Sequence, residues 1–384
     1  MSGDIAIIGI GLFPFGRHEG VNAIQMGVRA ANEALGDAGV AWKDVQFGCA
    51  GALEVTQPDA MIKFMGLTGI PFTSIFNGCA TGGSLLLSAS HAIAAGAGDV
   101  GIAVGFDKHP RGAFSVGDDL EGIGLGQWYG ETGLAMNPQF FAMKTRRYMH
   151  DHGIGEDCLH RTAVKAFGNG ARNPKAWRRQ ALDYDTIAAS RMVCDPLRQY
   201  HFCSPSEGAA AVVVCRADVA RRYTTKPVLL RADVFRTRLY GSFETMSPSV
   251  PSEGAESPTV QASRAAYEIA GIGPEDLGVA QIQDTEVGHE IMHMAENGFC
   301  KDGEQEAWIR EGATEIGGRL PINTDGGLLA NGEPIGASGL RQVHEVCLQL
   351  RGEAGARQVP GEPRTGYTHV YGFPGVSCVT VLST

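Results

Sequence analysis

The chain has 384 residues, of which 43% are hydrophobic and only 19% are charged, so it can bury a large core and is not intrinsically disordered. Its 53 glycines follow no three-residue repeat, which excludes a collagen-like fibre. The formal net charge of −10 and the lack of a basic run argue against nucleic-acid binding, and no apolar stretch approaches the ~20 residues that a membrane span needs.

The nine cysteines indicate the redox setting of the protein. None of them forms a CxxC pair, which argues against a zinc ribbon or a disulfide framework. We therefore expect a reduced, cytoplasmic protein. The apolar run at the N-terminus has no basic region before it, so it is interpreted as a buried strand and not as a signal peptide.

Short apolar runs alternate with alanine-rich helical stretches through the first hundred residues. Strands are expected at Ile5–Gly11, Val45–Val55 and Val100–Phe106, and helices at Ala23–Gly39 and Ser84–Gly96. This alternation is typical of an α/β chain whose sheet is covered by helices.

The composition changes after Val100–Phe106. Residues 107–199 are rich in Trp, Arg, Met and Asn, contain a helical segment at Phe140–His150, and are interpreted as an inserted region. A buried strand is expected again at Ala209–Cys215. The polar, Pro- and Ser-rich stretch Phe243–Pro258 then lies close to the start of a second half.

An internal repeat links the two halves of the chain. Each copy reads as a helix, an Ala-Gly turn, an acidic residue and a strand: Arg29-Ala-Ala-Asn-Glu-Ala, Ala38-Gly-Val and Asp44-Val, then Arg264-Ala-Ala-Tyr-Glu-Ile, Ala270-Gly-Ile and Asp276-Leu. Arg-Ala-Ala alone is common helix filler, but the matching order of four features favours duplication.

The first motif with chemical content is Asn77-Gly-Cys-Ala-Thr-Gly-Gly-Ser. It places Cys79 in a glycine-rich turn that enters a small-residue helix, where backbone N–H groups and the helix dipole favour a thiolate and can hold an oxyanion. A buried structural thiol is the alternative. The flanking glycines permit close approach of a ligand, which favours a nucleophile.

A second glycine-rich turn enters a second small-residue helix at Gly332-Glu-Pro-Ile-Gly-Ala-Ser-Gly, after Asn323-Thr-Asp-Gly-Gly. Asn77–Ser84 resembles the nucleophile motif of the thiolase superfamily, and Gly332–Gly339 resembles its Gly-His-Pro motif. The resemblance covers essentially the whole chain and is strongest to the sterol-carrier (lipid-transfer) branch, with its steroid side-chain aldolases and two-subunit bacterial thiolases.

The resemblance implies a thiolase fold: two duplicated βαβαβαββ halves with buried central helices, plus an inserted loop region. On this reading residues 1–106 and 200–225 form the N-terminal half, 107–199 the insertion and 226–384 the C-terminal half. It also implies that Cys79 is the catalytic nucleophile and that coenzyme A enters as a substrate thioester, with no metal expected in this chain.

Glu333 stands where the family has the histidine of Gly-His-Pro. A buried carboxylate can act as a base because desolvation raises its pKa, but when ionised it would repel an oxyanion at the place where histidine donates a hydrogen bond. Glu333 can therefore serve if it is protonated at that moment or faces the thiol. A helix-capping role is equally compatible with the sequence.

Gln283-Asp-Thr-Glu286 departs from the Asn-Glu-Ala-Phe of thiolases and the His-Asp-Cys-Phe of the sterol-carrier branch. The carboxamide of Gln283 can still hold a water in a thioester oxyanion hole. Thr285 occupies the position of the acid/base cysteine and cannot replace it. Glu286 replaces an apolar residue, so its charge needs either solvent or a partner.

The C-terminal motif Thr368-His-Val-Tyr-Gly aligns Gly372 with the family glycine. The Gly372 N–H can then contribute to an oxyanion hole with the N–H of Cys79. Val370 stands where the second cysteine is expected, so that cysteine is missing from both of its usual places. His369 and Tyr371 are candidate proton donors, with a structural role as the alternative.

One rival motif is the HExxH of His289-Glu-Ile-Met-His293, which on a helix can present two imidazoles to zinc. No third ligand follows at a usual spacing, so an ordinary helix is favoured. A second cluster, Lys175 to Arg179, can contact the phosphates and adenine of coenzyme A or can form a solvated helix face.

These features predict a thiolase-like acyltransferase that cleaves or forms a C–C bond in a bulky β-ketoacyl-CoA through an acyl-Cys79 intermediate. A retro-aldolase acting on a β-hydroxyacyl-CoA and a non-catalytic acyl-CoA-binding protein are the alternatives. The resemblance further implies a role in lipid degradation, a homodimer or larger oligomer, and a small zinc-binding OB-fold accessory protein. Neither nucleic acid nor membrane is an expected partner.

Overall fold

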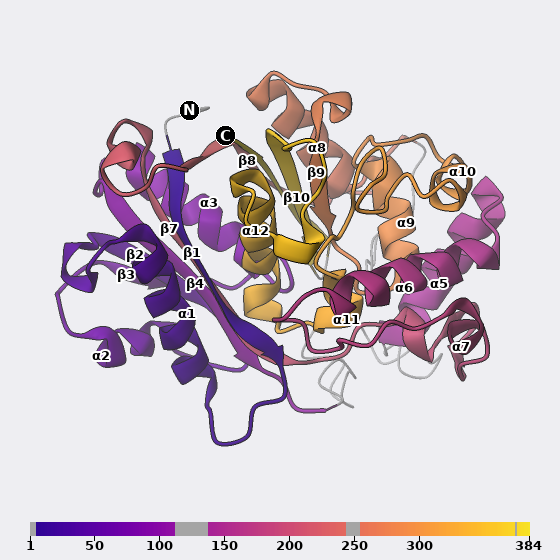
Figure 1. Cartoon of the computed structure of the whole chain (residues 1–384), viewed down its shortest axis with the longest axis horizontal. Helices are drawn as coiled ribbons and strands as arrows, with labels where there is room; N and C mark the ends of the chain where they lie inside the picture. Colours follow the sequence, from indigo (N-terminus) through magenta and orange to yellow (C-terminus); the bar gives the residue numbers. More distant parts are fainter. Residues whose placement is uncertain (1–4, 112–136, 243–253, 373–374) are drawn as a thin grey trace.

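A single nine-stranded sheet forms the centre of the protein (Figure 1). The computed structural model describes residues 5–111, 137–242, 254–372 and 375–384. The strand order is β3-β2-β4-β7-β1-β8-β11-β10-β9. The bounds are β1 Ile5–Gly16, β2 Phe47–Gly51, β3 Phe72–Ser74, β4 Val100–Lys108, β7 Glu207–Arg216, β8 Val228–Thr237, β9 Val279–Ile282, β10 Thr365–Gly372 and β11 Val376–Ser383.

The strand pairing repeats across the middle of the sheet. In the first half β7 is antiparallel to both β1 and β4, and β2 is parallel to β4. In the second half β11 is antiparallel to both β8 and β10, and β9 is parallel to β10. The halves meet where β1 pairs antiparallel with β8. This symmetry confirms the predicted α/β fold with duplicated halves.

The repeat seen in the sequence forms the same substructure twice. Helices α1 and α8 each end at a glycine with positive φ (63° at Gly39 and 68° at Gly271), and each is followed by a 3-10 turn and then by a strand. The bounds are α1 Ala23–Ala38 with turn Trp42–Asp44, and α8 Pro258–Ala270 with turn Pro274–Asp276. The predicted duplication is therefore confirmed in three dimensions.

Both faces of the sheet are buried, as the uninterrupted apolar run of β1 requires. Ile5 and Ile7 pack in the cluster that contains the central helices, whereas Ala6 and Ile8 pack against α1 on the other face. Alternate residues of a strand point to opposite faces, so a strand covered on both sides reads as continuously hydrophobic.

Two central helices, α3 (Thr81–Ala94) and α12 (Ile335–Arg351), come from equivalent places in the two halves. They cross at glycines: a Cβ atom on Gly82 would lie 2.7 Å from the Cα of Gly339. Side chains there would push the helices apart, so the glycines of both motifs set the distance between them.

Among the predicted boundaries that were wrong, two lie near Cys79 and Asp107. The helix predicted from Ser84 begins at Thr81, which moves its N-terminus next to Cys79. The strand predicted over Val45–Val55 covers only Phe47–Gly51, because the backbone N–H groups of Leu53 and Glu54 turn away to donate to the Asp107 carboxylate.

The region after β4 adds a helical layer beside the second half. It contains α5 (Asn137–His152), α6 (Glu156–Ala171), α7 (Tyr184–Ala188) and the short hairpin of β5 (Met192–Cys194) and β6 (Leu197–Arg198). Its apolar side chains form one cluster with Val287 and Ile291 of α9 (Val287–Glu296) and with Leu329 of α11 (Gly327–Asn331). The short helices α2 (Ile62–Met65) and α10 (Gln305–Arg310) complete the described helices.

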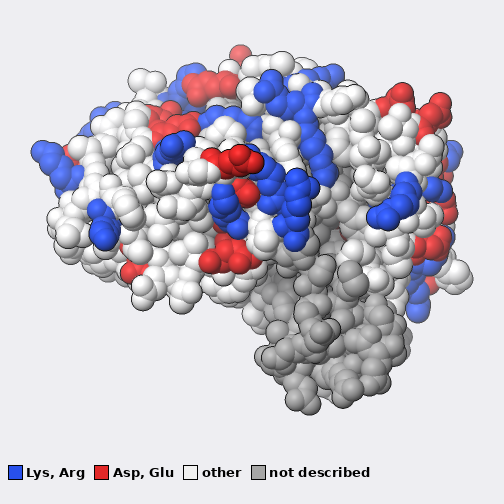
Figure 2. Space-filling model, turned by 90° about the horizontal axis from the view of Figure 1, so that it is seen from below, with Lys and Arg blue, Asp and Glu red and all other residues white. Residues whose placement is uncertain are grey.

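Within the described ranges, every helix is too short or too polar to cross a lipid bilayer. The surface charge is unevenly distributed despite the formal net charge of −10. On the face shown in Figure 2, Lys and Arg side chains gather near the middle, with Asp and Glu side chains between them.

Candidate active site

The turn before α3 holds Cys79 through three side-chain hydrogen bonds. The Thr81 hydroxyl donates to the Gly78 carbonyl at 2.6 Å and accepts from the Asn77 N–H at 2.9 Å, while the Asn77 carboxamide donates to Ser84 at 2.9 Å. Gly78 has a φ of 56°, which disfavours a side chain there. Cys79 is partly exposed as a residue and directly precedes the N-terminus of α3.

Glu333 lies directly opposite Cys79. It follows Gly332, whose φ is 76°, and it precedes α12; it is only 1% exposed. Its carboxylate accepts a hydrogen bond from Gln283 Nε2 at 3.0 Å. It also lies close enough to the Cys79 thiol to affect the pKa of that thiol. Burial raises the pKa of Glu333, although these two neighbours oppose the shift.

The Cys79 thiol is held in its protonated form. Burial raises the pKa of Cys79 well above its usual range, and the charge and hydrogen bond of Glu333 raise it further. The expectation that the helix N-terminus alone would favour a thiolate is therefore wrong, because desolvation and the neighbouring carboxylate outweigh it.

Two more predicted site residues meet this pair. Gln283 is fully buried beyond the end of β9, and besides Glu333 its Nε2 donates to Thr285 Oγ1 at 3.0 Å. Its Oε1 has no hydrogen-bond partner among the residues that the structure describes, so it can accept from a bound water or ligand. On the far side, a Cβ atom on Gly372 would lie 3.1 Å from the backbone nitrogen of Cys79. Four of the five predicted residues thus converge.

The fifth, His369, lies elsewhere on β10. Its Nε2 shares a 3.0 Å hydrogen bond with the Thr259 hydroxyl, and its ring contacts His293 at 4.5 Å between centroids. Burial, followed by the charge of His293, lowers the pKa of His369 well below its usual range. Among the described residues, its side-chain hydrogen bond and ring contact are with Thr259 and His293 and not with any of the other four. As a neutral imidazole it is a poor proton donor.

The HExxH residues form part of that same buried histidine cluster. The rings of His289 and His293 stack at 5.1 Å on α9, and His293 Nδ1 bonds Glu296 at 2.6 Å. Among the residues that the structure describes, no group of three or more His, Cys, Asp or Glu side chains is arranged to hold a metal ion.

The basic cluster in the inserted region has structural partners. Lys175 Nζ donates to the Leu12 carbonyl at 2.7 Å and pairs with Glu33. Arg178 donates to the Leu329 carbonyl at 2.8 Å and to the Ser204 hydroxyl. These contacts join the insertion to the two halves.

Sequence reasoning missed two residues that fix the start of α12. The Asp107 carboxylate accepts from the N–H of Gly336 at 2.6 Å, and His109 Nε2 accepts from the N–H of Ile335 at 3.0 Å. Since Nε2 accepts, Nδ1 carries the proton and donates to Glu54 at 3.0 Å. The only signal in the sequence was that Asp107, an acidic residue, directly follows the strand expected at Val100–Phe106.

It also missed Cys203, whose thiol donates to Glu333 Oε2 at 3.6 Å. The two residues are 130 positions apart, and no motif connects them.

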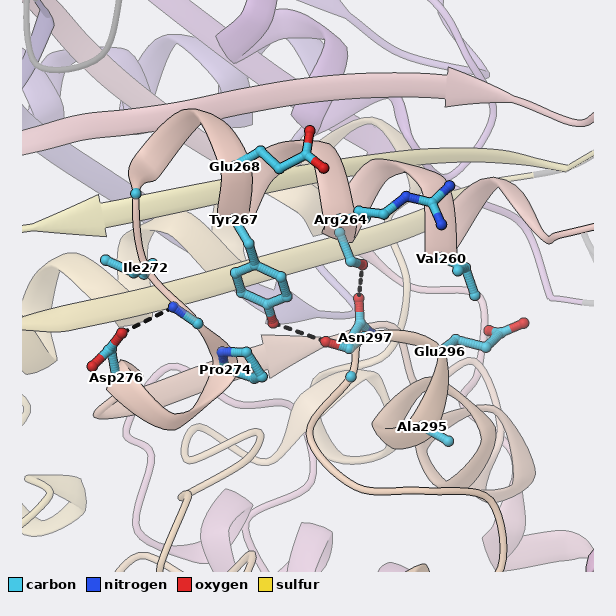
Figure 3. A pocket seen from close by; sticks show the side chains of 14 residues that line it. Val260, Arg264, Tyr267, Glu268, Ile272, Pro274, Asp276, Ala295, Glu296 and Asn297 are labelled. Atoms are coloured by element: carbon cyan, nitrogen blue, oxygen red, sulfur yellow. Dashed lines mark hydrogen bonds between the residues drawn. The ribbon is translucent and has the colours of Figure 1, made fainter.

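An open pocket of about 670 Å³ lies on the outside of the second half, between α8 and α9 (Figure 3). Its polar groups bond one another: Tyr267 donates to the Asn297 carbonyl at 2.8 Å, and the Gly273 N–H donates to Asp276 at 2.9 Å. None of the predicted site residues lines it, so it is separate from the Cys79 site.

Comparison with known proteins agrees with this geometry. The family description "Thiolase, N-terminal domain" matches residues 5–218, and "Thiolase C-terminal domain-like" matches residues 244–384. The chain belongs to the thiolase family. The acetyl-CoA acetyltransferase of Methanothermobacter thermautotrophicus is 34% identical to this thiolase over 394 residues, which cover 99% of each protein.

Two further relatives identify the branch. Sterol carrier protein 2 of Oryctolagus cuniculus is 29% identical over 392 residues, which cover 98% of this thiolase and 71% of that protein. A solved structure entitled "Ltp2-ChsH2(DUF35) aldolase" matches with a TM-score of 0.88 and 27% identity, covering 100% and 98% of the two chains. They support the predicted sterol-carrier branch.

Glu286 was expected to need either solvent or a partner for its charge, and the structure gives it partners. Its side chain caps α9, accepting from the N–H groups of Gly288 at 2.5 Å and His289 at 2.7 Å. Burial nevertheless raises the pKa of Glu286 to about 8. In the unfolded chain the Glu286 carboxyl loses its proton near the ordinary glutamate pKa. The protonated carboxyl therefore contributes to the stability of the folded protein at low pH, and this contribution is lost as pH rises toward 8.

We therefore expect Glu286→Gln to stabilise this thiolase relative to the parent as pH rises. The free energy of unfolding of the variant minus that of the parent should increase by on the order of 3 kcal/mol between pH 5 and pH 8. Urea denaturation at several pH values measures it. The surface substitution Glu268→Gln should show no such trend, and a flat difference for Glu286→Gln would contradict the assignment.

Proposed function

We propose that this thiolase is an acyl-CoA C-acyltransferase that cleaves or forms a C–C bond in a bulky β-ketoacyl-CoA through an acyl-Cys79 intermediate. The observation that carries the proposal is that the buried Glu333 carboxylate lies close enough to the Cys79 thiol to raise its pKa. A nucleophile needs an adjacent base when its own pKa is high, and Glu333 is that base.

The first chemical step follows from this contact. Glu333 takes the thiol proton as Cys79 Sγ attacks the keto carbonyl, so the carboxyl is neutral while negative charge builds on the substrate oxygen. That timing removes the repulsion that a carboxylate would otherwise exert. The N–H groups of Cys79 and Gly372 are the proposed oxyanion donors.

One neighbour completes the proposed site. Gln283 holds Glu333 through its Nε2, and its Oε1 is proposed to position a water or the thioester. For His369, which bonds Thr259, a structural role on β10 is proposed instead of proton donation. The basic side chains gathered on one face suit the phosphates of coenzyme A (Figure 2).

A retro-aldolase that cleaves a β-hydroxyacyl-CoA is the second candidate. The similarity to a structure entitled an aldolase, at 27% identity along the whole chain, favours it. That reaction needs no acyl-cysteine, so the two candidates differ in what they require of Cys79.

Quaternary structure forms part of the proposal. Strand β3 is an edge of the sheet, and nearby apolar side chains are unusually exposed, with Phe64 at 59% and Leu67 at 81%. An open edge with an apolar surround favours pairing with a second copy about a two-fold axis. An OB-fold accessory protein is also proposed, consistent with the two components named for the solved aldolase.

The nucleophile is tested by intact-protein mass spectrometry with a panel of β-ketoacyl-CoA thioesters. We expect an acyl mass on Cys79, its loss in Cys79→Ala, and a fall in C–C cleavage of at least about 1000-fold. The matched variant Cys300→Ala should keep both. An active Cys79→Ala protein would refute the acyl-enzyme and favour the retro-aldolase.

The homodimer is tested by sedimentation velocity. Leu67→Asp should convert a dimer to a monomer because it places a charge on the apolar surround of the edge strand. Ile269→Asp, on the exposed side of α8, should leave the dimer intact. A parent protein that sediments as a monomer at micromolar concentration would contradict the proposed interface.

A further inference from the structure

The Glu333 carboxylate serves two thiols and not one. Cys203 Sγ donates to its Oε2 at 3.6 Å, while Gln283 Nε2 donates to its Oε1 at 3.0 Å. The same carboxylate lies close enough to the Cys79 thiol to raise its pKa. Both cysteine residues are partly exposed, whereas Glu333 is buried.

The backbone holds Cys203 at this place. Its N–H donates to the Thr285 carbonyl at 2.9 Å, and the N–H of Glu333 donates to the Ser204 carbonyl at 2.9 Å. Pro205 and Glu333 form a further parallel bridge. The segment before β7 thus runs alongside both the Glu333 turn and the Gln283 loop, and it supplies a thiol next to Thr285, which has none.

The surroundings of Cys203 favour the protonated thiol, although a cationic side chain, that of Arg178, lies near it. Burial and the charges of Glu333 and Asp284 raise the pKa of the Cys203 thiol, whereas the Arg178 guanidinium, which bonds the neighbouring Ser204, opposes them. A protonated thiol that a nearby cation can stabilise after ionisation is suited to deliver a proton.

We propose that Cys203 is the second acid/base of the site and gives its thiol proton to the carbon that leaves when the C–C bond breaks. This inference rests on the proposed function. Cleavage of a β-keto thioester leaves an electron pair on the α-carbon of the departing thioester, and a proton donor is needed there. Glu333 is already engaged with the proton of Cys79.

The atoms balance over one half-reaction. The Cys79 proton passes to Glu333 while Sγ bonds the keto carbon. The C–C bond then breaks, its electron pair goes to the α-carbon, and that carbon takes the Cys203 proton. The Cys203 thiolate recovers a proton from Glu333 through their hydrogen bond. The products are acyl-Cys79 and a shorter acyl-CoA, with Cys203 and Glu333 restored.

The test separates this proton transfer from acylation. Deuterium exchange of the methyl group of acetyl-CoA in D₂O reports the α-carbon step. Transfer of the acetyl group from acetyl-CoA to Cys79, which breaks no C–C bond, reports the nucleophile through the added acyl mass. Cys203→Ala should slow exchange by about 100-fold or more while acylation stays within about 3-fold of the parent. Cys300→Ala is the control and should change neither.

A second variant guards against local distortion. Cys203→Ser keeps a hydrogen-bond donor toward Glu333, but its hydroxyl is a far weaker acid than the thiol. This variant should therefore also lose deuterium exchange while keeping acylation of Cys79. Parent-like exchange in either variant would overturn the role of Cys203. A parent protein that acylates Cys79 but does not exchange deuterium would also overturn the role of Cys203, while the proposed acyl-Cys79 intermediate would stand. A parent protein that forms no acyl-Cys79 would refute the proposed function itself.

Discussion

A single buried carboxylate organises this site. Glu333 is 1% exposed, and a charge so placed is tolerated only if hydrogen-bond donors surround it. Those donors come from three distant parts of the chain: Cys79 before α3, Cys203 before β7 and Gln283 after β9. The requirement to satisfy one carboxylate therefore explains why the two halves must be in register.

The duplicated fold makes that convergence geometrically simple. The two central helices have equivalent places in the two halves, so their N-terminal turns, one bearing Cys79 and the other Glu333, meet near the pseudo-two-fold axis. Gly82 and Gly339 let the helices approach closely enough for the turns to touch. Part of the glycine excess thus has a structural reason, because it sets the distance between the proposed nucleophile and its proposed base.

Local patterns predicted much of this arrangement. The two glycine-rich turns gave Cys79 and Glu333, the repeat gave the duplicated halves, and alignment of motifs gave Gln283 and Gly372. Cys203 was not predictable because its role depends on a contact across 130 residues. The ionisation of Cys79 was predicted in the wrong direction, since a helix dipole is visible in sequence while desolvation and a facing carboxylate are properties of the packed structure.

The most direct test of this account is the pKa of Glu333 itself, followed by infrared spectroscopy of ¹³C-labelled glutamate and assigned by subtraction of a Glu333→Gln spectrum. The hydrogen bonds from Cys79 and Cys203 both lower this pKa against the effect of burial. The account predicts that it rises in Cys79→Ala, rises in Cys203→Ala, and rises further in the double variant. A Glu333 titration that is unchanged by either single substitution would contradict the shared carboxylate.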